Sequence, residues 1–198
     1  MATRDQQLNW AVDVADGVEG WMPRPQLHLL ASMAAEVDAD SVIIEVGTYR
    51  GRSAVALALG AASGAGARVY TFDPHLTFQG ARGGSFGPHD QAELYANLTR
   101  TGVGAGVFVA SIDSTIAARG WPQRNVGMLF IDGDHRMEAV LADVRAWAPH
   151  LRDGTPVVFD DFDYHEVMAA IAELEQSGVI EPLGTDDRLG LYRSPGRS

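Results

Sequence analysis

Short apolar runs and helical patterns alternate along most of the chain. Val42–Val46 is a β-branched run that ends at Gly47, and residues 53–62 after it have the small apolar residues of a packed helix. The same alternation predicts further strands at 68–72, 106–110, 126–131 and 156–159, and helices at 25–37, 90–101, 114–119, 137–148 and 166–176. Strands separated by helices favour right-handed crossovers, so the pattern predicts an α/β fold with a doubly wound, mostly parallel sheet.

Both ends of the chain depart from this alternation. Residues before 25 are a short polar segment, and residues 1–40 are expected to form an N-terminal helical segment that packs on a core of residues 41–198 within one domain. At the other end, Val179–Leu183 and Leu189–Arg193 flank a polar turn with no helix between them, which predicts a β-hairpin. The glycine-rich residues 74–88 fit either a surface insertion or a flap over the strand ends.

Composition removes several chemistries from consideration. The 198 residues carry a formal net charge of -11, all 15 basic residues are arginine, and cysteine is absent. Schiff-base lysines, P-loop lysines, thiol nucleophiles and thiolate metal sites are therefore excluded. The acidic balance and the lack of a basic stripe argue against a nucleic-acid partner. With no signal peptide or membrane-length apolar run, we expect a cytoplasmic protein without a membrane partner, and homo-oligomerisation stays open.

Ligands of doubly wound sheets bind outside the carboxyl ends of the strands, so residues that follow the strands are the candidates for chemistry. The first turn, Glu45–Ser53, has glycines four positions apart and places Thr48 and Tyr49 where a dinucleotide fingerprint has its middle glycine. This departure argues against a nicotinamide-dinucleotide-binding protein. It suits S-adenosylmethionine, which has no pyrophosphate, with Glu45 supporting either the cofactor's ammonium group or the turn itself.

Two later strand ends offer contacts to an adenosine cofactor. Asp73 lies 26 residues after Gly47, where a carboxylate can accept both ribose hydroxyls, although an aspartate before Pro74 is also a common turn former. Ser111 and Asp113 follow the third strand near the expected adenine edge, and Asp113 can instead cap the next helix.

The densest cluster of acids follows the fourth and fifth strands. Asp132 ends one apolar run and the pair Asp160 and Asp161 ends the next, so neighbouring strands would bring three carboxylates together. Their mutual repulsion calls for protons or a cation, and oxygen donors select a hard ion such as magnesium. His135 can reach the same pocket as a base, whereas Asp134 is assigned to helix capping.

These residues together resemble the class I S-adenosylmethionine-dependent methyltransferases, and more narrowly the macrocin O-methyltransferase and cephalosporin-hydroxylase-like group. The specific segments are residues 44–53, 71–75, 129–135 and 159–162. The resemblance implies a Rossmann-like sheet of seven strands whose last hairpin inserts one antiparallel strand. It also implies magnesium on Asp132, Asp160 and Asp161, with His135 and Asp132 as catalytic residues. The cofactor contacts are expected at Glu45, Gly47, Tyr49, Gly51, Ser53, Asp73, Ser111, Asp113 and Asp132.

The expected function is therefore magnesium-dependent O-methylation of a small molecule such as a sugar or natural product. Two alternatives stay open: a metal-independent carboxyl- or N-methyltransferase, and a non-catalytic cofactor-binding subunit. Methylation of nucleobase or glutamine amino groups is disfavoured, because residues 131–134 stand where such enzymes carry an Asn/Asp-Pro-Pro-aromatic tetrad.

Overall fold

A single seven-stranded sheet organises the protein, in the order β5-β2-β1-β6-β7-β9-β8. The computed structural model describes residues 2–80, 83–122 and 125–196. The strands of this sheet are β1 Val42–Val46, β2 Arg68–Phe72, β5 Val107–Ala110, β6 Val126–Ile131, β7 Pro156–Phe159, β8 Glu181–Asp186 and β9 Leu189–Arg193. β9 lies antiparallel between β7 and β8, and the first five strands of the order are parallel. The predicted α/β fold class and its terminal hairpin are confirmed.

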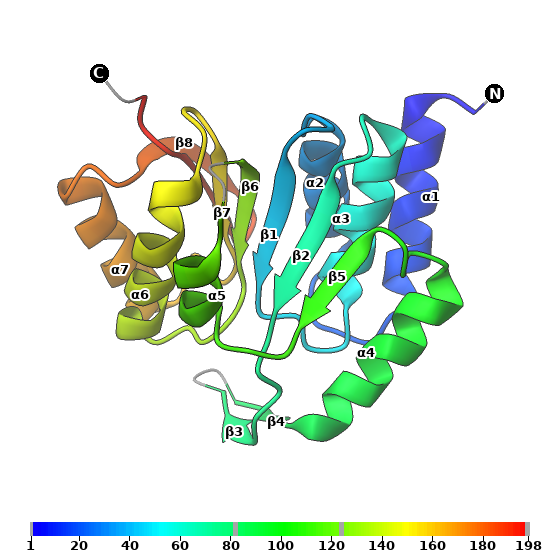
Figure 1. The fold of residues 1–198 in the computed structure, drawn as a ribbon, viewed down its shortest axis with the longest axis horizontal. Helices are drawn as coiled ribbons and strands as arrows, with labels where there is room; N and C mark the ends of the chain where they lie inside the picture. Colours follow the sequence, from blue (N-terminus) through cyan, green and yellow to red (C-terminus); the bar gives the residue numbers. More distant parts are fainter. Residues whose placement is uncertain (1, 81–82, 123–124, 197–198) are drawn as a thin grey trace.

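Helices cover both faces of this sheet, as Figure 1 shows. α1 to α4 pack on one face and α5 to α7 on the other. Their bounds are α1 Arg4–Asp16, α2 Arg24–Ala35, α3 Arg52–Ser63, α4 Pro88–Thr101, α5 Ser114–Gly120, α6 Met137–Trp147 and α7 His165–Gln176, with a 3-10 turn η1 at Ala148–His150. Among the described residues, none of these helices combines the length and apolar sequence that crossing a bilayer requires.

The central strands are apolar without interruption because both of their faces are covered. Ile43 and Ile44 are each fully buried, yet Ile43 packs with the helices of one face and Ile44 with those of the other. Burial on both sides fixes the register of the strands firmly. A fixed register also fixes where each strand ends, and therefore where the residues that follow it lie.

Residues 4–16, within the polar start of the chain, form the helix α1, which the sequence pattern did not single out. A capping box begins the helix: the Thr3 hydroxyl accepts from the amide of Gln6, whose side chain accepts from the amide of Thr3. The buried face of α1 consists of Leu8, Ala11, Val12 and Ala15. Two of these four are alanines, so the apolar stripe contrasts little with its polar surroundings in the sequence.

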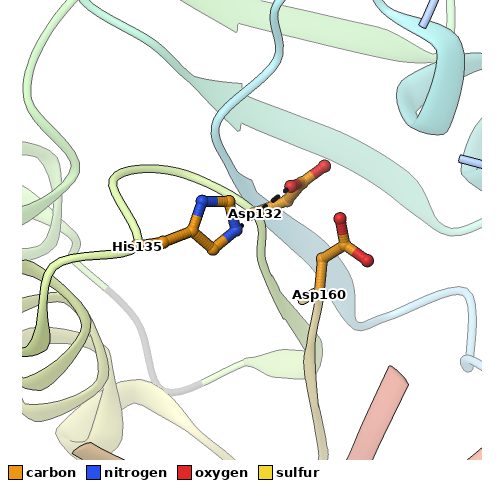
Figure 2. Close-up of side chains that lie close together, drawn as sticks. All are labelled: Asp132, His135 and Asp160. Atoms are coloured by element: carbon orange, nitrogen blue, oxygen red, sulfur yellow. Dashed lines mark ion pairs between the residues drawn. The ribbon is translucent and has the colours of Figure 1, made fainter. Parts of the chain in front are cut away.

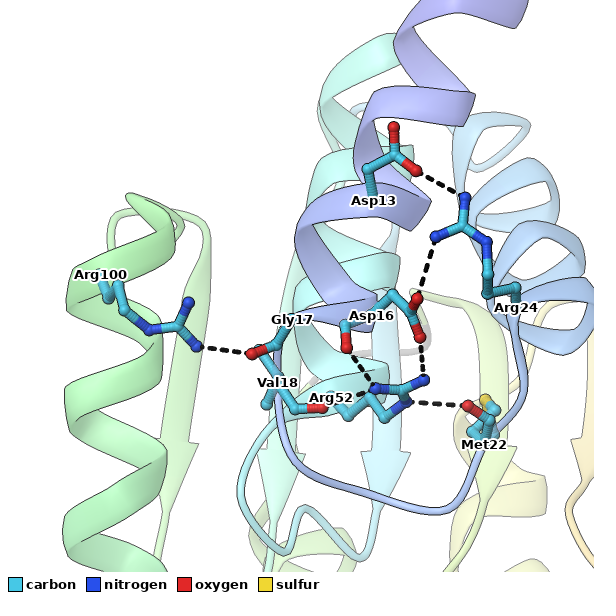
Figure 3. Close-up of polar contacts among 8 residues, drawn as sticks. All are labelled: Asp13, Asp16, Gly17, Val18, Met22, Arg24, Arg52 and Arg100. Atoms are coloured by element: carbon cyan, nitrogen blue, oxygen red, sulfur yellow. Dashed lines mark hydrogen bonds and ion pairs between the residues drawn. The ribbon is translucent and has the colours of Figure 1, made fainter.

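Arg52, the first residue of α3, ties the segment between α1 and α2 to the core (Figure 3). Its guanidinium donates to the carbonyls of Asp16, Val18 and Met22 at 2.8, 2.6 and 2.8 Å, and to the Asp16 carboxylate at 2.5 Å. The side chain of Arg52 is only 13% exposed. One arginine thus replaces water for three carbonyls that helix ends and turns leave unpaired.

The glycine-rich residues 74–88 contain a small hairpin that the sequence pattern does not predict. β3 Phe78–Gln79 pairs antiparallel with β4 Ser85–Phe86. The strands are two residues long, too short for a periodic pattern to appear. Figure 1 shows the hairpin beyond the carboxyl ends of β1, β2 and β5, on the side opposite both chain termini.

Candidate active site

The turn after β1 approaches the end of β6 so closely that only glycine fits. Gly47 has φ +86°, and a Cβ there would lie 2.2 Å from the carbonyl oxygen of Asp132. Its amide donates to the carbonyl of Phe72 at 2.9 Å, which ties the ends of β1 and β2 together. Gly47 also lines the cavity at the strand ends, where a ligand can approach its backbone.

Glu45 supports the turn, which is one of the two roles predicted for it. The side chain is fully buried, and the Ser53 hydroxyl donates to its carboxylate at 2.6 Å. Burial raises the pKa of Glu45 to about 7, and the hydrogen bonds from Ser53 and Thr71 offset only part of that shift. Burial thus favours the protonated form of this glutamate more than exposure to solvent would.

Asp73 organises the same turn from the end of β2. One carboxylate oxygen accepts the amides of Thr48 and Tyr49, both at 3.0 Å, and the other accepts the amide of His75 at 2.8 Å. The last bond is the local turn that aspartate commonly forms. Each carboxylate oxygen can accept two hydrogen bonds, so Asp73 retains capacity for a ligand hydroxyl.

Asp132, His135 and Asp160 converge at the ends of β6 and β7 (Figure 2). One potential ligand atom from each of the three lies within 4.8 Å of the others. The pKa of Asp132 is raised well above its usual range, first by burial and then by the adjacent charge of Asp160. Two carboxylates at this separation repel each other, so the arrangement favours a proton or a cation between them.

Asp161 lies beside this cluster and pairs with an arginine. Its φ of +50° places the backbone in the left-handed region, and its carboxylate pairs with Arg188. The other carboxylate oxygen lies 3.7 Å from His135 Nε2, which is also 3.8 Å from Asp132. The structure thus assembles two of the three predicted metal carboxylates with the predicted base, and directs the third to Arg188.

A cavity of about 780 Å³ connects the glycine turn with the carboxylate cluster. The predicted site residues that line it are Gly47, Tyr49, Ser53, Asp73, Asp113, Asp132, His135, Asp160 and Asp161. Glu45, Gly51 and Ser111 are not among the residues that line it, and their cofactor contacts stay predictions. Gly51 serves the fold, because its φ is +88° and a Cβ would meet Leu94. Ser111 accepts a hydrogen bond from Gln91 on the exposed surface.

The far side of the cavity holds a buried pair that the sequence analysis missed. Ser114 on α5 donates to the carboxylate of Asp143 on α6, and both side chains are more than nine-tenths buried. Burial raises the pKa of Asp143 to about 6. Asp113 beside them caps α5, accepting the amides of Thr115 and Ile116 at 2.9 and 3.2 Å. No sequence signal marks Asp143, because it lies inside a helix and not after a strand.

Comparison with known proteins identifies the family that shares this arrangement. A family model described as a methyltransferase domain matches residues 44–162, from β1 to the residues that follow β7. The chain belongs to this methyltransferase family. The matched segment contains the glycine turn, Asp73 and the cluster of Asp132, His135 and Asp160. The resemblance to class I methyltransferases, read from the same residues, is confirmed.

Solved structures share the fold of this methyltransferase over almost its whole length. The O-methyltransferase NovP superposes with a TM-score of 0.79 at 12% identity, covering 98% of this chain and 100% of its own. An O-methyltransferase from Bacillus cereus in complex with SAH gives 0.67 at 16% identity, with 98% and 93% covered. The SAH-bound methyltransferase PaMTH1 from Podospora anserina gives 0.68 at 15% identity, with 95% and 87% covered. At these identities, the likeness concerns the fold.

Proposed function

We propose that this methyltransferase transfers the methyl group of S-adenosylmethionine to a hydroxyl oxygen of a small molecule. One observation chiefly supports the proposal: Asp132, His135 and Asp160 face the same cavity as the glycine turn at Gly47. A methyl donor at the turn and a hydroxyl at the cluster would meet within one enclosed space, as in-line transfer requires. Two similar folds named O-methyltransferases, one of them in complex with SAH, agree with this assignment.

The cofactor is proposed to lie along the carboxyl ends of β1, β2 and β5. The turn at Gly47 lets the backbone approach the methionine portion, and Asp73 accepts hydrogen bonds from the ribose. The adenine would then lie toward Asp113 at the start of α5, where the cavity continues. Because the backbone amides of Thr48 and Tyr49 already hold Asp73, its carboxylate is positioned before the cofactor binds.

The carboxylate cluster has the chemistry of a site for a hard divalent cation. Asp132 and Asp160 offer oxygen donors, and their mutual repulsion would be relieved by a positive charge such as Mg²⁺. When bound there, such an ion would stabilise the negative charge that develops on the acceptor oxygen. Asp161 was predicted as a third ligand, and its pairing with Arg188 favours a positioning role instead.

His135 is proposed to take the proton of the acceptor hydroxyl. Its Nε2 lies between the carboxylates of Asp132 and Asp161, at 3.8 and 3.7 Å. These negative charges favour the protonated ring once the proton has moved. Arg188 holds Asp161 in place, so the imidazole faces the cavity in a defined orientation.

The test separates cofactor binding from metal binding. Calorimetric titration with S-adenosylmethionine, repeated in Mg²⁺ and in chelator, is expected to give micromolar binding in both. Asp160→Asn is expected to leave cofactor affinity within about threefold, while Mn²⁺ binding measured by electron paramagnetic resonance weakens at least tenfold. Glu93→Gln, an exposed acid on α4, is the matched control and should change neither.

A methyl-transfer assay on the same protein, with and without chelator, separates the alternatives. Turnover that survives the chelator unchanged would favour a metal-independent carboxyl- or N-methyltransferase. Cofactor binding with no methyl transfer to hydroxyl, carboxyl or amine acceptors would favour a cofactor-binding subunit without catalysis. Failure to bind S-adenosylmethionine in either condition would overturn the proposed function altogether.

A further inference from the structure

Four aromatic rings from three separate parts of the chain meet at the wall of the active-site cavity. Trp21, before α2, stacks on Tyr49 of the glycine turn with centroids 4.9 Å apart and 27° between the ring planes. Phe86 of β4 meets both rings edge-on, at 5.9 Å from Trp21 and 5.5 Å from Tyr49. Phe78 of β3 stacks on Phe86 at 4.8 Å. We call Trp21, Tyr49, Phe86 and Phe78 the aromatic wall.

Two rings of the aromatic wall, those of Trp21 and Phe78, are exposed instead of packed in the hydrophobic core. Trp21 is 69% exposed, Phe78 39%, and the neighbouring Leu76 68%, and all of them line the cavity. Large apolar side chains gathered at one exposed place are uncommon on a protein surface unless something covers them. The cavity they line is the one that holds Asp132 and Asp160, so the covering molecule and the reacting hydroxyl share one space.

The backbone around the wall is held in place at a conformational cost. Tyr49 has φ +48°, which a bulky side chain rarely adopts. Asp73 accepts its amide at 3.0 Å, and His75 Nε2 lies 3.1 Å from its carbonyl oxygen. On the other side, Arg52 donates to the carbonyls of Val18 and Met22, on either side of Trp21 in the sequence (Figure 3). The rings are thus presented to the cavity by two separate polar networks.

The charges around the cavity select against an anionic ligand. Its described lining contains seven aspartates and three arginines. The three arginines already pair with acids: Arg52 with Asp16, Arg136 with Asp134, and Arg188 with Asp161. With these three arginines paired, no arginine of the described lining is left to hold a carboxylate or phosphate of the acceptor, whereas a neutral or cationic group needs none.

From the rings, their exposure and these charges, we infer that the aromatic wall is the acceptor subsite, and that it takes a planar aromatic hydroxy compound that is uncharged or cationic. The inference rests on the proposed function and narrows its acceptor. A planar ring can stack on Trp21 or meet the edges of the neighbouring rings, as these rings already do with one another. Its hydroxyl would then point toward Asp132 and Asp160 in the same cavity.

The test is equilibrium binding of defined probes to the protein saturated with S-adenosylhomocysteine and Mg²⁺. The probes are 2,3-dihydroxynaphthalene, its carboxylate analogue 6,7-dihydroxy-2-naphthoate, which keeps the adjacent hydroxyls, and methyl α-glucoside as a sugar. We expect the neutral naphthalene to bind at least tenfold more tightly than the other two. Trp21→Ala is expected to weaken its binding about tenfold, and Trp21→Phe by much less. Trp10→Ala, at a similarly exposed tryptophan on α1 outside the cavity lining, should have no effect.

Affinity for S-adenosylhomocysteine, measured first in each variant, keeps this inference separate from the proposed function. If the wild-type protein does not bind S-adenosylhomocysteine, the proposed function fails. If it binds and Trp21→Ala leaves the naphthalene affinity unchanged, the aromatic wall is not the acceptor subsite. Tighter binding of the glucoside or of the carboxylate probe would overturn the chemical class. A large loss of S-adenosylhomocysteine affinity in Trp21→Ala would assign the wall to the cofactor instead.

Discussion

Asp132 and Asp160 leave neighbouring strands at the same level, because Ile131 and Phe159 are partners in the parallel register of β6 and β7. The amide of Asp160 donates to the carbonyl of Ile131 at 3.0 Å, so the pairing extends to the acids themselves. Two adjacent carboxylates at the end of a buried sheet are costly to the fold when no cation lies between them. The register of the sheet thus places the two carboxylates side by side. Because this placement is unfavourable for folding, it indicates that the two acids have a role in function.

This cost leads to a prediction for Asp160→Asn. Removing one of two repelling charges should make the protein in chelator as stable as wild type or more so, by up to about 1 kcal/mol. Methyl transfer should fall at least 100-fold, because the amide no longer supplies the charge that a cation needs. Thermal unfolding by circular dichroism and turnover with excess S-adenosylmethionine measure the two effects. A variant that loses stability and activity together would indicate a structural role for Asp160.

The raised pKa of Glu45 leads us to expect that the free energy of unfolding depends on pH. Its pKa is raised to about 7 in the folded protein from 4.5, so the folded state binds the proton more tightly. The stability it contributes is full below about pH 4.5, falls as pH rises to about 7, and changes no further above that. The loss across this window should be on the order of 3 kcal/mol.

Glu45→Gln isolates this effect, since Asp143, whose pKa is raised to about 6, changes stability in the same direction. The difference in unfolding free energy between variant and wild type should grow in favour of glutamine between pH 4.5 and 7. Urea unfolding at half-unit pH intervals measures it, with the exposed Glu93→Gln as the control. Parallel curves for Glu45→Gln and wild type would mean that Glu45 ionises normally.

The sheet and the acids that follow its strands could be predicted because both depend on local pattern. The continuous apolar run of β6 identifies a strand buried on both faces, and Asp132 directly after it must lie at the carboxyl edge. The residue types there, together with the turn at Gly47, were sufficient to indicate the family. All of these signals are read within a few residues of a strand end.

The features that were missed depend on packing between distant segments. Asp143 reaches the cavity from within α6, and Arg188 from the turn between β8 and β9. Nothing near either residue in the sequence indicates a site. Asp161 was grouped with Asp160 by adjacency, but its left-handed backbone directs the side chain to Arg188. A left-handed backbone at a single residue depends on its surroundings in the fold, so the alternating pattern of a strand in the sequence does not reveal it.

Gly47→Ala is predicted to be severely destabilising. The new Cβ would fall 2.2 Å from the Asp132 carbonyl oxygen, and both groups belong to the backbone of packed strand ends. Gly66→Ala provides the matched control, because Gly66 has a similar φ of +81° and nothing within 4 Å of a Cβ. The control should lose about 1 kcal/mol for the left-handed backbone alone. Gly47→Ala should lose at least about 2 kcal/mol more, or fail to fold. Equal losses in urea unfolding would show that the close approach to β6 is not important.

The hydrogen bonds of Arg52 lead to a prediction about how α1 is attached to the rest of the domain. Arg52→Met keeps an apolar stem of similar length but leaves the carbonyls of Asp16, Val18 and Met22 without their donor. We expect a loss of about 2–4 kcal/mol, since three carbonyl acceptors, two of them part-buried, lose their partner at once. Arg4→Met, which removes an exposed ion pair with Glu36, should cost less than about 1 kcal/mol. Hydrogen exchange gives the location: in Arg52→Met, the amides of α1 should exchange much faster while those of β6 keep their protection. Uniform acceleration across both elements would show instead that Arg52 stabilises the whole domain and not the attachment of α1.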